Sequence, residues 1–480
     1  MKRNEVLILG TDCLLIGCIV PLGNEEAFKE LVGGKTTDSF FYPQILYETL
    51  NYVTYLENCD RNPDYIVSFE KEKDLLDEKL AKGVKVVGIF TQFLSRIDDY
   101  IKVIRHIKTG YPDIKIAVGG SFIKNLIKKL SGRERRIILG KIDADVYIYR
   151  YECQVEFGKY VRYVRDGGEG LSEIPNILWL ENGELHTSTM GLIGGYEDSH
   201  AICWDKYQNR VGGIAALRST INCDFECAFC AIKDDSEAFR KIGIGSIKDN
   251  LDGLARLKQV KTIFYSDETV NYPKDRFIDL LNMQIQGDYP FNWYGFLRCQ
   301  YIDPEIASLL EKSKCIGAIL GLESGDAPML ERMNKKVNIE EYREGHRLLK
   351  KHGIFTFALF VVGFPGEDEF TMKETMDFIN DLKPDFYILN PWTCEEGTTI
   401  YEQRSKYGLS MKNGKWRHDT MDSQMADDAV MRMRKKIHGS IDACDIDLSY
   451  IIQLLDDGYA LDQIRGFIDG YRQKANVGIK

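Results

Sequence analysis

The sequence predicts an α/β protein with an N-terminal doubly wound, Rossmann-like domain, a partial (β/α)6 barrel and a small, mostly helical C-terminal region. A chain of 480 residues is longer than one ordinary hydrophobic core requires. From residue 213 onward, short apolar runs rich in β-branched and aromatic residues alternate with segments of helical periodicity. The first 195 residues show a second, separate alternation. We therefore expect domains at residues 1–195, 205–405 and 406–480.

The barrel is predicted from six strands and the helices that join them. We expect the strands at residues 213–221, 261–266, 292–298, 316–322, 356–362 and 385–390. The helices are expected at residues 246–260, 274–286, 303–314, 339–352 and 369–382. Strands joined by helices form a parallel sheet. In such barrels the loops after the strands carry the chemistry.

The N-terminal domain is predicted from four strands, at residues 5–9, 84–90, 114–118 and 144–149. Helical segments at residues 97–109 and 122–130 separate them, which is typical of a doubly wound sheet. Residues 25–80 are too long for one crossover and are not assigned. A hairpin is expected from residues 174–181 and 184–187, joined by Asn182-Gly183.

Composition indicates a globular enzyme, with 44% hydrophobic and 28% charged residues. The net charge of −10 argues against nucleic acid or a membrane surface as a partner. No run of 18 apolar residues and no signal peptide is seen. Twelve cysteines without a secretion signal favour a reducing compartment, so we expect a cytoplasmic protein.

Three cysteines follow the first barrel strand with the spacing Cys-x3-Cys-x2-Cys: Cys223, Cys227 and Cys230. Thiolates this close form a soft pocket suited to iron–sulfur ligation. Three ligands for a [4Fe–4S] cluster leave one iron open, which predicts a catalytic cluster. The alternatives are a zinc knuckle or unrelated core cysteines. Zinc prefers four ligands, and the nearest candidates, His200 and Cys203, lie well upstream.

The spacing, together with Phe229, is similar to the signature of the radical S-adenosylmethionine (SAM) superfamily. The resemblance implies that the open iron chelates the amino and carboxylate groups of SAM. One electron then cleaves SAM to a 5′-deoxyadenosyl radical. It also implies an external electron donor such as flavodoxin or ferredoxin.

Two strand ends carry charged residues that match SAM-binding positions of the superfamily. Asp267 and Glu268 match by position a motif that meets the SAM amine, although a solvated turn would also explain them. Arg298 is similar to an arginine that faces the SAM carboxylate, and a structural ion pair is the alternative.

Two further strand ends resemble superfamily motifs. Glu323 and Ser324 lie in Gly-Leu-Glu-Ser-Gly, which resembles the ribose motif, although a helix cap is the alternative. Gly363 and Pro365 lie in Gly-Phe-Pro-Gly, a turn that in these enzymes approaches the adenine and methionine ends of SAM. An ordinary strand-to-helix turn is the alternative there.

A Rossmann-like domain before such a barrel resembles the cobalamin-binding radical SAM class. The resemblance implies that a corrin lies against the ends of the N-terminal strands, where glycines permit close approach. The expected contacts are Thr91, Gln92, Gly119, Gly120, Ser121, Tyr151 and Glu152.

One feature departs from the mutase type of cobalamin domain. None of the seven histidines lies in an Asp-x-His-x-x-Gly motif, so the lower face of cobalt would have no histidine ligand. The alternative is a degenerate domain that keeps the fold without a corrin.

The resemblance implies a methyltransferase that acts, with cobalamin, on an unactivated carbon or phosphorus of a small-molecule or carrier-bound substrate. The segments 12–17 and 415–423 resemble a subgroup that includes phosphinate P-methyltransferases and related natural-product methyltransferases. Packing of the C-terminal segment against the barrel mouth would also explain Trp416 and His418. Two alternatives remain, namely a cobalamin-assisted rearrangement or cyclisation, and an N-terminal substrate-recognition module without a corrin. The sequence identifies no catalytic acid or base.

Overall fold

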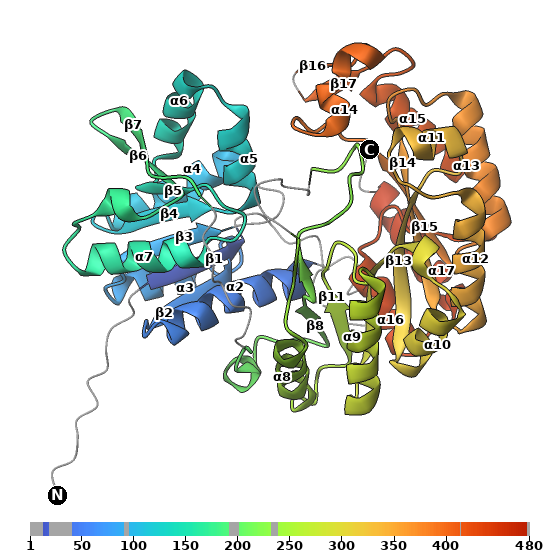
Figure 1. Ribbon diagram of the computed structural model, residues 1–480, viewed down its shortest axis with the longest axis horizontal. Helices are drawn as coiled ribbons and strands as arrows, with labels where there is room; N and C mark the ends of the chain where they lie inside the picture. The colour runs from blue at the N-terminus through green and yellow to red at the C-terminus, as the bar shows by residue number, and fades with distance from the viewer. Residues whose placement is uncertain are drawn as a thin grey trace, which may run out of the picture. The chain divides into compact units, whose positions relative to one another are not determined.

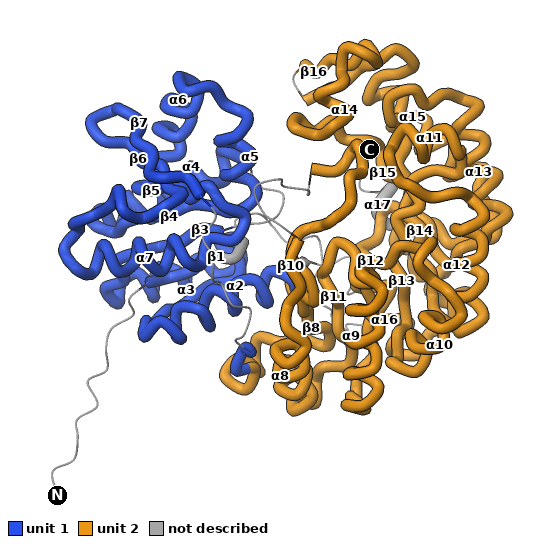
Figure 2. Tube along the Cα trace, viewed as in Figure 1, with its two compact units in different colours: residues 1–23, 44–203 blue, residues 24–43, 204–480 orange. Residues whose placement is uncertain are grey.

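The computed structural model describes residues 13–18, 41–90, 96–191, 201–231, 239–412 and 414–477 (Figure 1). The chain divides into two compact units (Figure 2). Unit 1 comprises residues 1–23 and 44–203, and unit 2 comprises residues 24–43 and 204–480. Among the described residues, no helix is long and apolar enough to cross a membrane.

Unit 1 contains a seven-stranded sheet in the order β2-β1-β3-β4-β5-β6-β7. The strands are β1 (Cys13–Cys18), β2 (Pro63–Ser68), β3 (Val86–Phe90), β4 (Lys115–Gly119), β5 (Val146–Ile148), β6 (Ile177–Glu181) and β7 (Glu184–Thr187). Strands β1 to β5 are parallel, and β6 and β7 add an antiparallel hairpin at one edge. The order of the parallel strands is that of a doubly wound sheet, which confirms the predicted class.

Helices cover both faces of this sheet. They are α2 (Phe41–Asn58), α3 (Lys73–Ala81), α4 (Ile97–Gly110), α5 (Ser121–Lys129), α6 (Gly132–Ile142) and α7 (Gln154–Arg165). Val87 and Ile89 of β3 belong to the core formed with α3, α4, α5 and α6. Phe90 faces the opposite side and packs against Phe157 of α7. Gly88 shares that face, because a Cβ there would lie 2.7 Å from the Phe157 ring.

Three details of unit 1 bear on the predictions. The strand expected at residues 5–9 lies outside the described residues, and β1 is at Cys13–Cys18. The unassigned stretch 25–80 includes α2, β2 and α3. The hairpin is confirmed, since Asn182 and Gly183 have φ values of 50° and 78°, as its tight turn requires.

Unit 2 contains a seven-stranded sheet in the order β18-β15-β14-β13-β12-β11-β8. The strands are β8 (Ile214–Leu217), β11 (Thr262–Tyr265), β12 (Asn292–Leu297), β13 (Cys315–Glu323), β14 (Phe355–Val362), β15 (Phe386–Pro391) and β18 (Ile441–Asp442). All neighbours pair in parallel, so their carboxyl ends share one edge. The six predicted strands are confirmed, and β18 is an additional seventh.

The helices of unit 2 follow the predicted pattern. They are α8 (Ile244–Ala255), α9 (Lys274–Gly287), α10 (Pro304–Lys312), α11 (Ala327–Arg332), α12 (Ile339–Lys351) and α13 (Glu369–Leu382). Asp303 caps α10 by accepting a hydrogen bond from the Ile306 amide. Asn338 and Glu341 form a capping box at the start of α12. Of these six helices, α11 lacks a counterpart among the predicted ones.

The C-terminal region is more than the helical segment that was expected. It contains β16 (Ser410–Lys412), β17 (Lys415–Arg417), α15 (Ser423–Arg434), α16 (Leu448–Asp456) and α17 (Leu461–Val477), besides β18. Asp456 of α16 accepts hydrogen bonds from Thr262 and Asn292, the first residues of β11 and β12. Helix α16 therefore packs at the amino ends of these strands and leaves their carboxyl ends to the loops.

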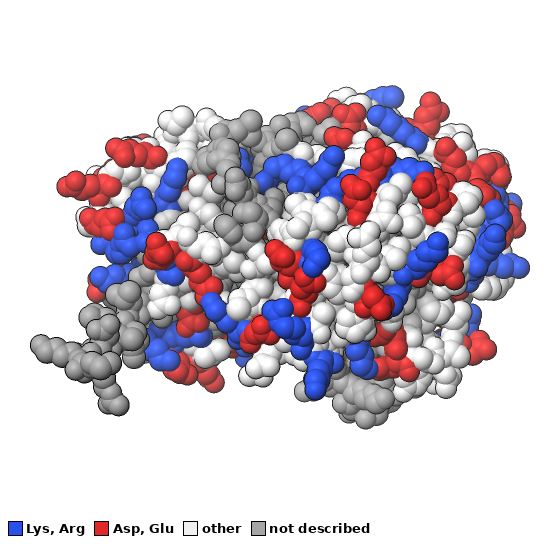
Figure 3. Space-filling view, turned by 60° about the horizontal axis from the view of Figure 1, so that its bottom comes forward, with Lys and Arg blue, Asp and Glu red and all other residues white. Residues whose placement is uncertain are grey.

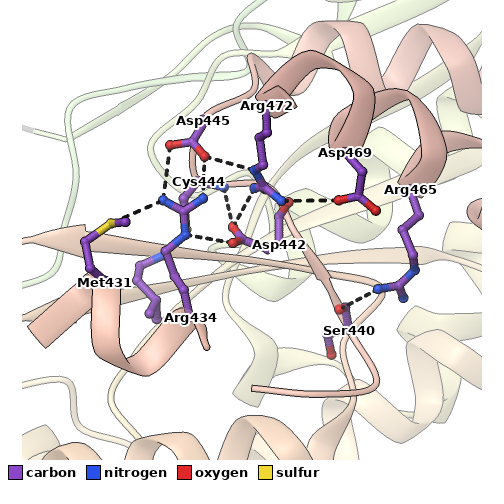
Figure 4. Close-up of polar contacts among 10 residues, drawn as sticks. Met431, Arg434, Ser440, Asp442, Cys444, Asp445, Arg465, Asp469 and Arg472 are labelled. Carbon is purple, nitrogen blue, oxygen red and sulfur yellow. Dashed lines mark hydrogen bonds and ion pairs between the residues drawn. The ribbon is translucent and has the colours of Figure 1, made fainter. Parts of the chain in front are cut away.

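An ion-pair network connects α15, β18 and α17 (Figure 4). Arg434 Nε lies 2.7 Å from Asp442 Oδ2, and Arg472 Nη2 lies 3.0 Å from Asp442 Oδ1. Both arginines also pair with Asp445. Two arginines thus hold the short strand β18, which has only two residues of sheet pairing.

Charged side chains of both signs are interspersed on the face in Figure 3. Over the described residues of that face, no broad surface of one sign is seen.

We predict that Arg434→Ala lowers the free energy of unfolding by about 2 kcal/mol, because it leaves the mostly buried Asp442 with one fewer cation. Arg432→Ala on the same helix is the control, since its ion pair with Glu369 joins side chains that are 52% and 82% exposed. That control should cost less than about 0.5 kcal/mol. Urea unfolding measures both, and equal losses would contradict a structural role of the network.

Candidate active site

The predicted site residues of unit 2 follow the carboxyl ends of β9 (Thr220–Ile221), β11, β12, β13 and β14. Strands β8, β11, β12, β13 and β14 belong to one parallel sheet, and the chain continues from β8 into β9. The loops after these strands therefore meet at one edge of the sheet. The structure therefore gathers residues that are up to about 140 positions apart in the sequence, from Cys223 to Pro365.

The cysteine loop, residues 222–231, is held through its main chain. The Ala228 amide donates to the Met333 carbonyl at 2.8 Å, and the Ala228 carbonyl accepts from the Ile400 amide at 3.0 Å. Asn334 Nδ2 donates to the Glu226 carbonyl at 2.6 Å. Two segments distant in sequence thus fix the path of the loop.

Cys223, Cys227 and Cys230 are all half-buried on this loop. A single zinc ion would require sulfur atoms about 2.3 Å from one centre. In the described part of the chain, no group of three His, Cys, Asp or Glu side chains is arranged to hold one metal ion. A [4Fe–4S] cluster takes one thiolate for each iron, so three cysteines on one anchored loop supply the donors for three of its irons.

Arg298 contacts the cysteine loop directly. Its Nη2 lies 3.2 Å from Cys227 Sγ, and its guanidinium carbon lies 3.5 Å from the centre of the Phe225 ring. Nη1 donates to the Lys335 carbonyl at 3.2 Å. The side chain expected to face the SAM carboxylate is therefore engaged with the protein.

Asp267 and Glu268 lie differently, although they are neighbours. Asp267 is buried and accepts hydrogen bonds from the amides and hydroxyls of Ser219 and Thr220. Burial raises the pKa of Asp267, and those hydrogen bonds oppose the rise. Its carboxyl thus holds the loop that leads into β9.

Glu268 is half-buried. Burial chiefly raises the pKa of the Cys223 thiol, and the charge of Glu268 adds to that rise. Glu268 is therefore near enough to the cysteine loop for its charge to act on Cys223.

Glu323 ends β13 in a strained conformation, with φ 66°. Its Oε1 accepts a hydrogen bond from Lys335 Nζ at 2.9 Å in a mostly buried ion pair. Gly321 leaves room for that pair, since a Cβ there would lie 2.5 Å from Glu323 Oε1. The ammonium of Lys335 lies 6.0 Å from the centre of the Phe229 ring, which places Glu323 beside the cysteine loop.

Ser324 is fully buried and makes internal contacts. Its hydroxyl lies 3.2 Å from that of Thr375 and accepts from the Asp326 amide at 3.1 Å. Asp326 in turn caps α11. For Ser324, the structure thus favours the helix-start role that was the alternative.

The turn after β14 is held from both sides at Gly363, whose φ of 94° favours glycine. The Gly363 amide donates to the Glu367 carboxyl group, and the Gly363 carbonyl lies 3.1 Å from His418 Nε2. Because His418 Nδ1 accepts from the Thr420 amide, Nε2 carries the proton. The Pro365 carbonyl accepts from Arg332 Nη1 at 3.2 Å.

Aromatic rings surround this turn. Phe364 contacts Phe229 edge-on at 6.3 Å and Trp392 at 5.6 Å between ring centres. Trp416 of the C-terminal hairpin stacks on His418 at 5.1 Å. These contacts agree with the alternative given for Trp416 and His418, namely packing of the C-terminal segment at the barrel mouth. Two buried polar atoms here, Glu367 Oε1 and Trp392 Nε1, have no hydrogen-bond partner within the described residues.

In unit 1, two of the three predicted contact segments are described. Gly119 ends β4, Gly120 follows it and Ser121 begins α5, and Tyr151 and Glu152 lie between β5 and α7. Thr91 and Gln92 lie outside the described residues. Since β4 and β5 are parallel neighbours, the two segments share one edge of the sheet.

Cys153 joins these two segments. Its sulfur accepts a hydrogen bond from the Gly120 amide at 3.2 Å. A Cβ at Gly119 would lie 2.7 Å from the same sulfur, so internal packing already requires glycine there. Gly120 has a φ of 86°, which also favours glycine.

Three side chains of the site have roles that sequence reasoning missed. Lys335 pairs with Glu323, Glu367 holds the Gly363 amide, and Asn334 anchors the cysteine loop. Glu367 follows the recognised turn motif and so could have been found. Asn334 and Lys335 lie in Met-Asn-Lys-Lys, where no spacing marks a contact with the cysteines.

A comparison with known protein families finds a match within unit 2. Residues 217–379 match the Radical SAM superfamily, which confirms that resemblance. The chain is 23% identical over 365 residues to an uncharacterised methyltransferase of Pyrococcus horikoshii, across 74% of this chain and 77% of that protein. It is 27% identical over 198 residues to the anaerobic magnesium-protoporphyrin IX monomethyl ester cyclase of Rubrivivax gelatinosus, covering 39% of this chain and 35% of the cyclase.

Two solved structures share the fold. The radical SAM methyltransferase TsrM of Kitasatospora setae, with cobalamin and a [4Fe–4S] cluster bound, covers 98% of this chain with a TM-score of 0.71 and 13% identity. The cobalamin-dependent radical SAM enzyme OxsB covers 94% of this chain, which spans 61% of OxsB, with a TM-score of 0.59 and 14% identity. The predicted combination of the two folds is confirmed.

Glu367 gives a pH-dependent prediction. Burial raises the pKa of this carboxyl from its usual 4.5 to about 8. Between these values the folded protein keeps a proton that the unfolded chain releases, so stability falls as pH rises through this window. Relative to Glu367→Gln, the wild type should lose up to about 1.4 kcal/mol per pH unit.

Urea unfolding at several pH values between 5 and 8 measures this difference. Glu369→Gln, in which an 82% exposed side chain is changed, should follow the wild type. Parallel stability curves for the wild type and Glu367→Gln would disprove a neutral Glu367.

Proposed function

We propose that this chain, whose residues 217–379 form a radical SAM domain, is a cobalamin-dependent radical SAM methyltransferase. The observation that carries the proposal is the likeness of the whole chain, both units included, to a methyltransferase structure that holds cobalamin and a [4Fe–4S] cluster. We propose as substrate an unactivated carbon or phosphorus centre of a small molecule or natural-product intermediate. A phosphinate phosphorus is one such centre.

The chemistry of such a centre explains the need for two cofactors. An unactivated carbon has no lone pair to accept a methyl cation, so ordinary transfer from SAM has no partner. A bound cluster would supply the electron that cleaves one SAM to a radical, and a corrin methylated by a second SAM would supply the methyl group that a substrate radical can accept. An external one-electron donor is part of this proposal.

The residues of unit 2 receive the following roles. Cys223, Cys227 and Cys230 bind the cluster. Glu268, which lies toward Cys223, accepts hydrogen bonds from the SAM amine. Glu323, oriented by Lys335, meets the ribose hydroxyls.

The turn of Gly363 and Pro365 approaches SAM through its backbone, with Phe229 and Phe364 as apolar walls. Asp267, Arg298 and Ser324 have protein partners and hold the loops instead.

Unit 1 would hold the corrin at the edge formed by the segments after β4 and β5. Of the histidines described in unit 1, His106 pairs with Asp77 at 2.7 Å and His186 stacks on Trp179. Neither follows β4 or β5. A corrin at this edge would take no ligand from these two histidines.

A second candidate function is a cobalamin-assisted rearrangement or cyclisation. It is favoured by the local similarity to a cyclase over 198 residues. The third is a unit 1 that presents a substrate without a corrin. The products and the corrin content of the protein separate all three.

We predict that Cys223→Ser, Cys227→Ser and Cys230→Ser each prevent stable cluster assembly, because a hydroxyl is a far weaker ligand for iron than a thiolate. After anaerobic reconstitution with iron and sulfide, iron content and visible absorption should fall to near background. Cys203→Ser, which removes an exposed cysteine, should match the wild type. Zinc in place of iron, or full iron content in the three variants, would disprove the cluster assignment.

Corrin binding is tested with hydroxocobalamin under anaerobic conditions. The wild type should retain the corrin through gel filtration, while Tyr151→Ala and Glu152→Gln should bind it roughly tenfold more weakly if one contact of about 1.4 kcal/mol is lost. Glu169→Gln, an exposed residue beyond α7, is the control. Reduced protein with SAM should then form S-adenosylhomocysteine only when the corrin is bound.

Each outcome distinguishes the candidate functions. S-adenosylhomocysteine together with 5′-deoxyadenosine supports methylation. If the corrin binds and only 5′-deoxyadenosine forms, the rearrangement is favoured. If no corrin binds while SAM is still cleaved, unit 1 is a recognition module.

A further inference from the structure

Contacts of both its backbone and its side chain hold Arg298 next to the cysteine loop. Its amide donates to Asn271 Oδ1 at 2.8 Å, and its carbonyl accepts from Asn271 Nδ2 at 2.9 Å. Both residues are buried, with exposed fractions of 8% for Arg298 and 2% for Asn271. Asn271 therefore fixes the backbone of Arg298 independently of the contacts that the Arg298 side chain makes.

The guanidinium group is oriented just as closely. Nη1 donates to the Lys335 carbonyl, and Nη2 points at Cys227 Sγ, both at 3.2 Å. The plane of the group covers the Phe225 ring at 3.5 Å. Phe225 lies between Cys223 and Cys227 in the sequence, so one arginine contacts both a cysteine and the loop that carries it.

We infer that Arg298 tunes and positions the cluster rather than binding the carboxylate of SAM. This inference rests on the proposed function, because it requires a cluster on Cys227. A hydrogen bond to a ligating sulfur, and a fixed positive charge beside it, favour the cluster state that carries one more electron. Such an arginine raises the reduction potential of the cluster, so an external donor can reduce it more readily.

The guanidinium of Arg298 has two candidate anionic partners, the Cys227 thiolate and the carboxylate of SAM, and the geometry decides between them. A bidentate contact with a carboxylate needs two N–H groups directed to the same side. Here one N–H of each terminal nitrogen is directed to a different protein atom, Cys227 Sγ and the Lys335 carbonyl. The guanidinium carbon lies 3.5 Å from the centre of the Phe225 ring. These three contacts hold the group at Cys227, so Arg298 acts as a positioning residue for Cys227.

The test compares three variants of the full-length protein after anaerobic reconstitution. Arg298→Met removes the charge and the N–H donors while keeping an unbranched apolar stem. Arg298→Lys keeps the charge and loses the planar fork. Lys336→Met is the matched control, because it removes an exposed positive charge whose nearest acidic partner, Glu226, belongs to the cysteine loop.

The first readout is the midpoint potential of the cluster, from a redox titration followed by electron paramagnetic resonance. In Arg298→Met, the ratio of reduced to oxidised cluster at a fixed potential should fall roughly tenfold, which corresponds to about 59 mV for one electron. Arg298→Lys should give a smaller shift in the same direction. Lys336→Met should match the wild type.

The second readout is the affinity for SAM, from the change that SAM causes in the resonance spectrum. All variants should bind SAM within about threefold of the wild type, because a loss of one carboxylate contact would exceed that. An unchanged potential in Arg298→Met would overturn the inference. A weakening of SAM binding of roughly a hundredfold, reversed in part by lysine, would also overturn it.

The controls separate this inference from the proposed function. If the wild type assembles no cluster, the proposed function fails. If the wild type assembles a cluster with the same potential as Arg298→Met, only the role of Arg298 fails. Should Arg298→Met lose the cluster while circular dichroism shows a folded protein, the potential of Arg298→Lys decides, and a potential equal to the wild type rejects the inference.

Discussion

One turn at the end of α11 determines how the loops of the site are held together. The helix ends in a Schellman motif, since the Lys335 amide donates to the Leu330 carbonyl and the Asn334 amide to the Glu331 carbonyl. Asn334 takes the left-handed conformation that the motif requires, with φ 53°. The turn presents the Met333 carbonyl and the Asn334 side chain to the cysteine loop, and it presents Lys335 to Glu323. The Lys335 carbonyl also accepts a hydrogen bond from Arg298, which follows β12. The loops after β9, β12 and β13 therefore depend on a single helix ending.

Adjacent polar residues at the strand ends have different roles. Asp267 is buried and held by Ser219 and Thr220, whereas Glu268 is half-buried and its charge acts on Cys223. The same division separates Glu323, paired with Lys335, from the buried Ser324. Each motif thus supplies one residue that builds the loop and one residue that can meet a ligand.

Much of the fold could be predicted from the sequence, because the signals were local. Strand runs such as β14 and caps such as Asp303 are encoded in a few adjacent residues, and their elements lie where expected. The pairing of β18 with β15 could not be predicted, since two residues carry no periodicity and their pairing depends on distant arginines. The direction of Arg298 was likewise hidden. A guanidinium can donate to a ligand carboxylate or to a thiolate, and only the fold decides which of them it meets.

In this site, buried side chains and loop backbones have different roles. Asp267, Arg298, Ser324 and Glu367 are each buried with protein partners. Their contribution is to fix the backbone of loops, which then approach a ligand through amides, carbonyls and aromatic edges. At Gly363, an amide held by Glu367 and a carbonyl held by His418 leave one peptide orientation for the whole turn. A substitution at such a residue changes the geometry of every group on its loop, so its effect on the chemistry exceeds that of any single contact it makes. The charged residues at these strand ends act first on the protein, and through it on the ligand.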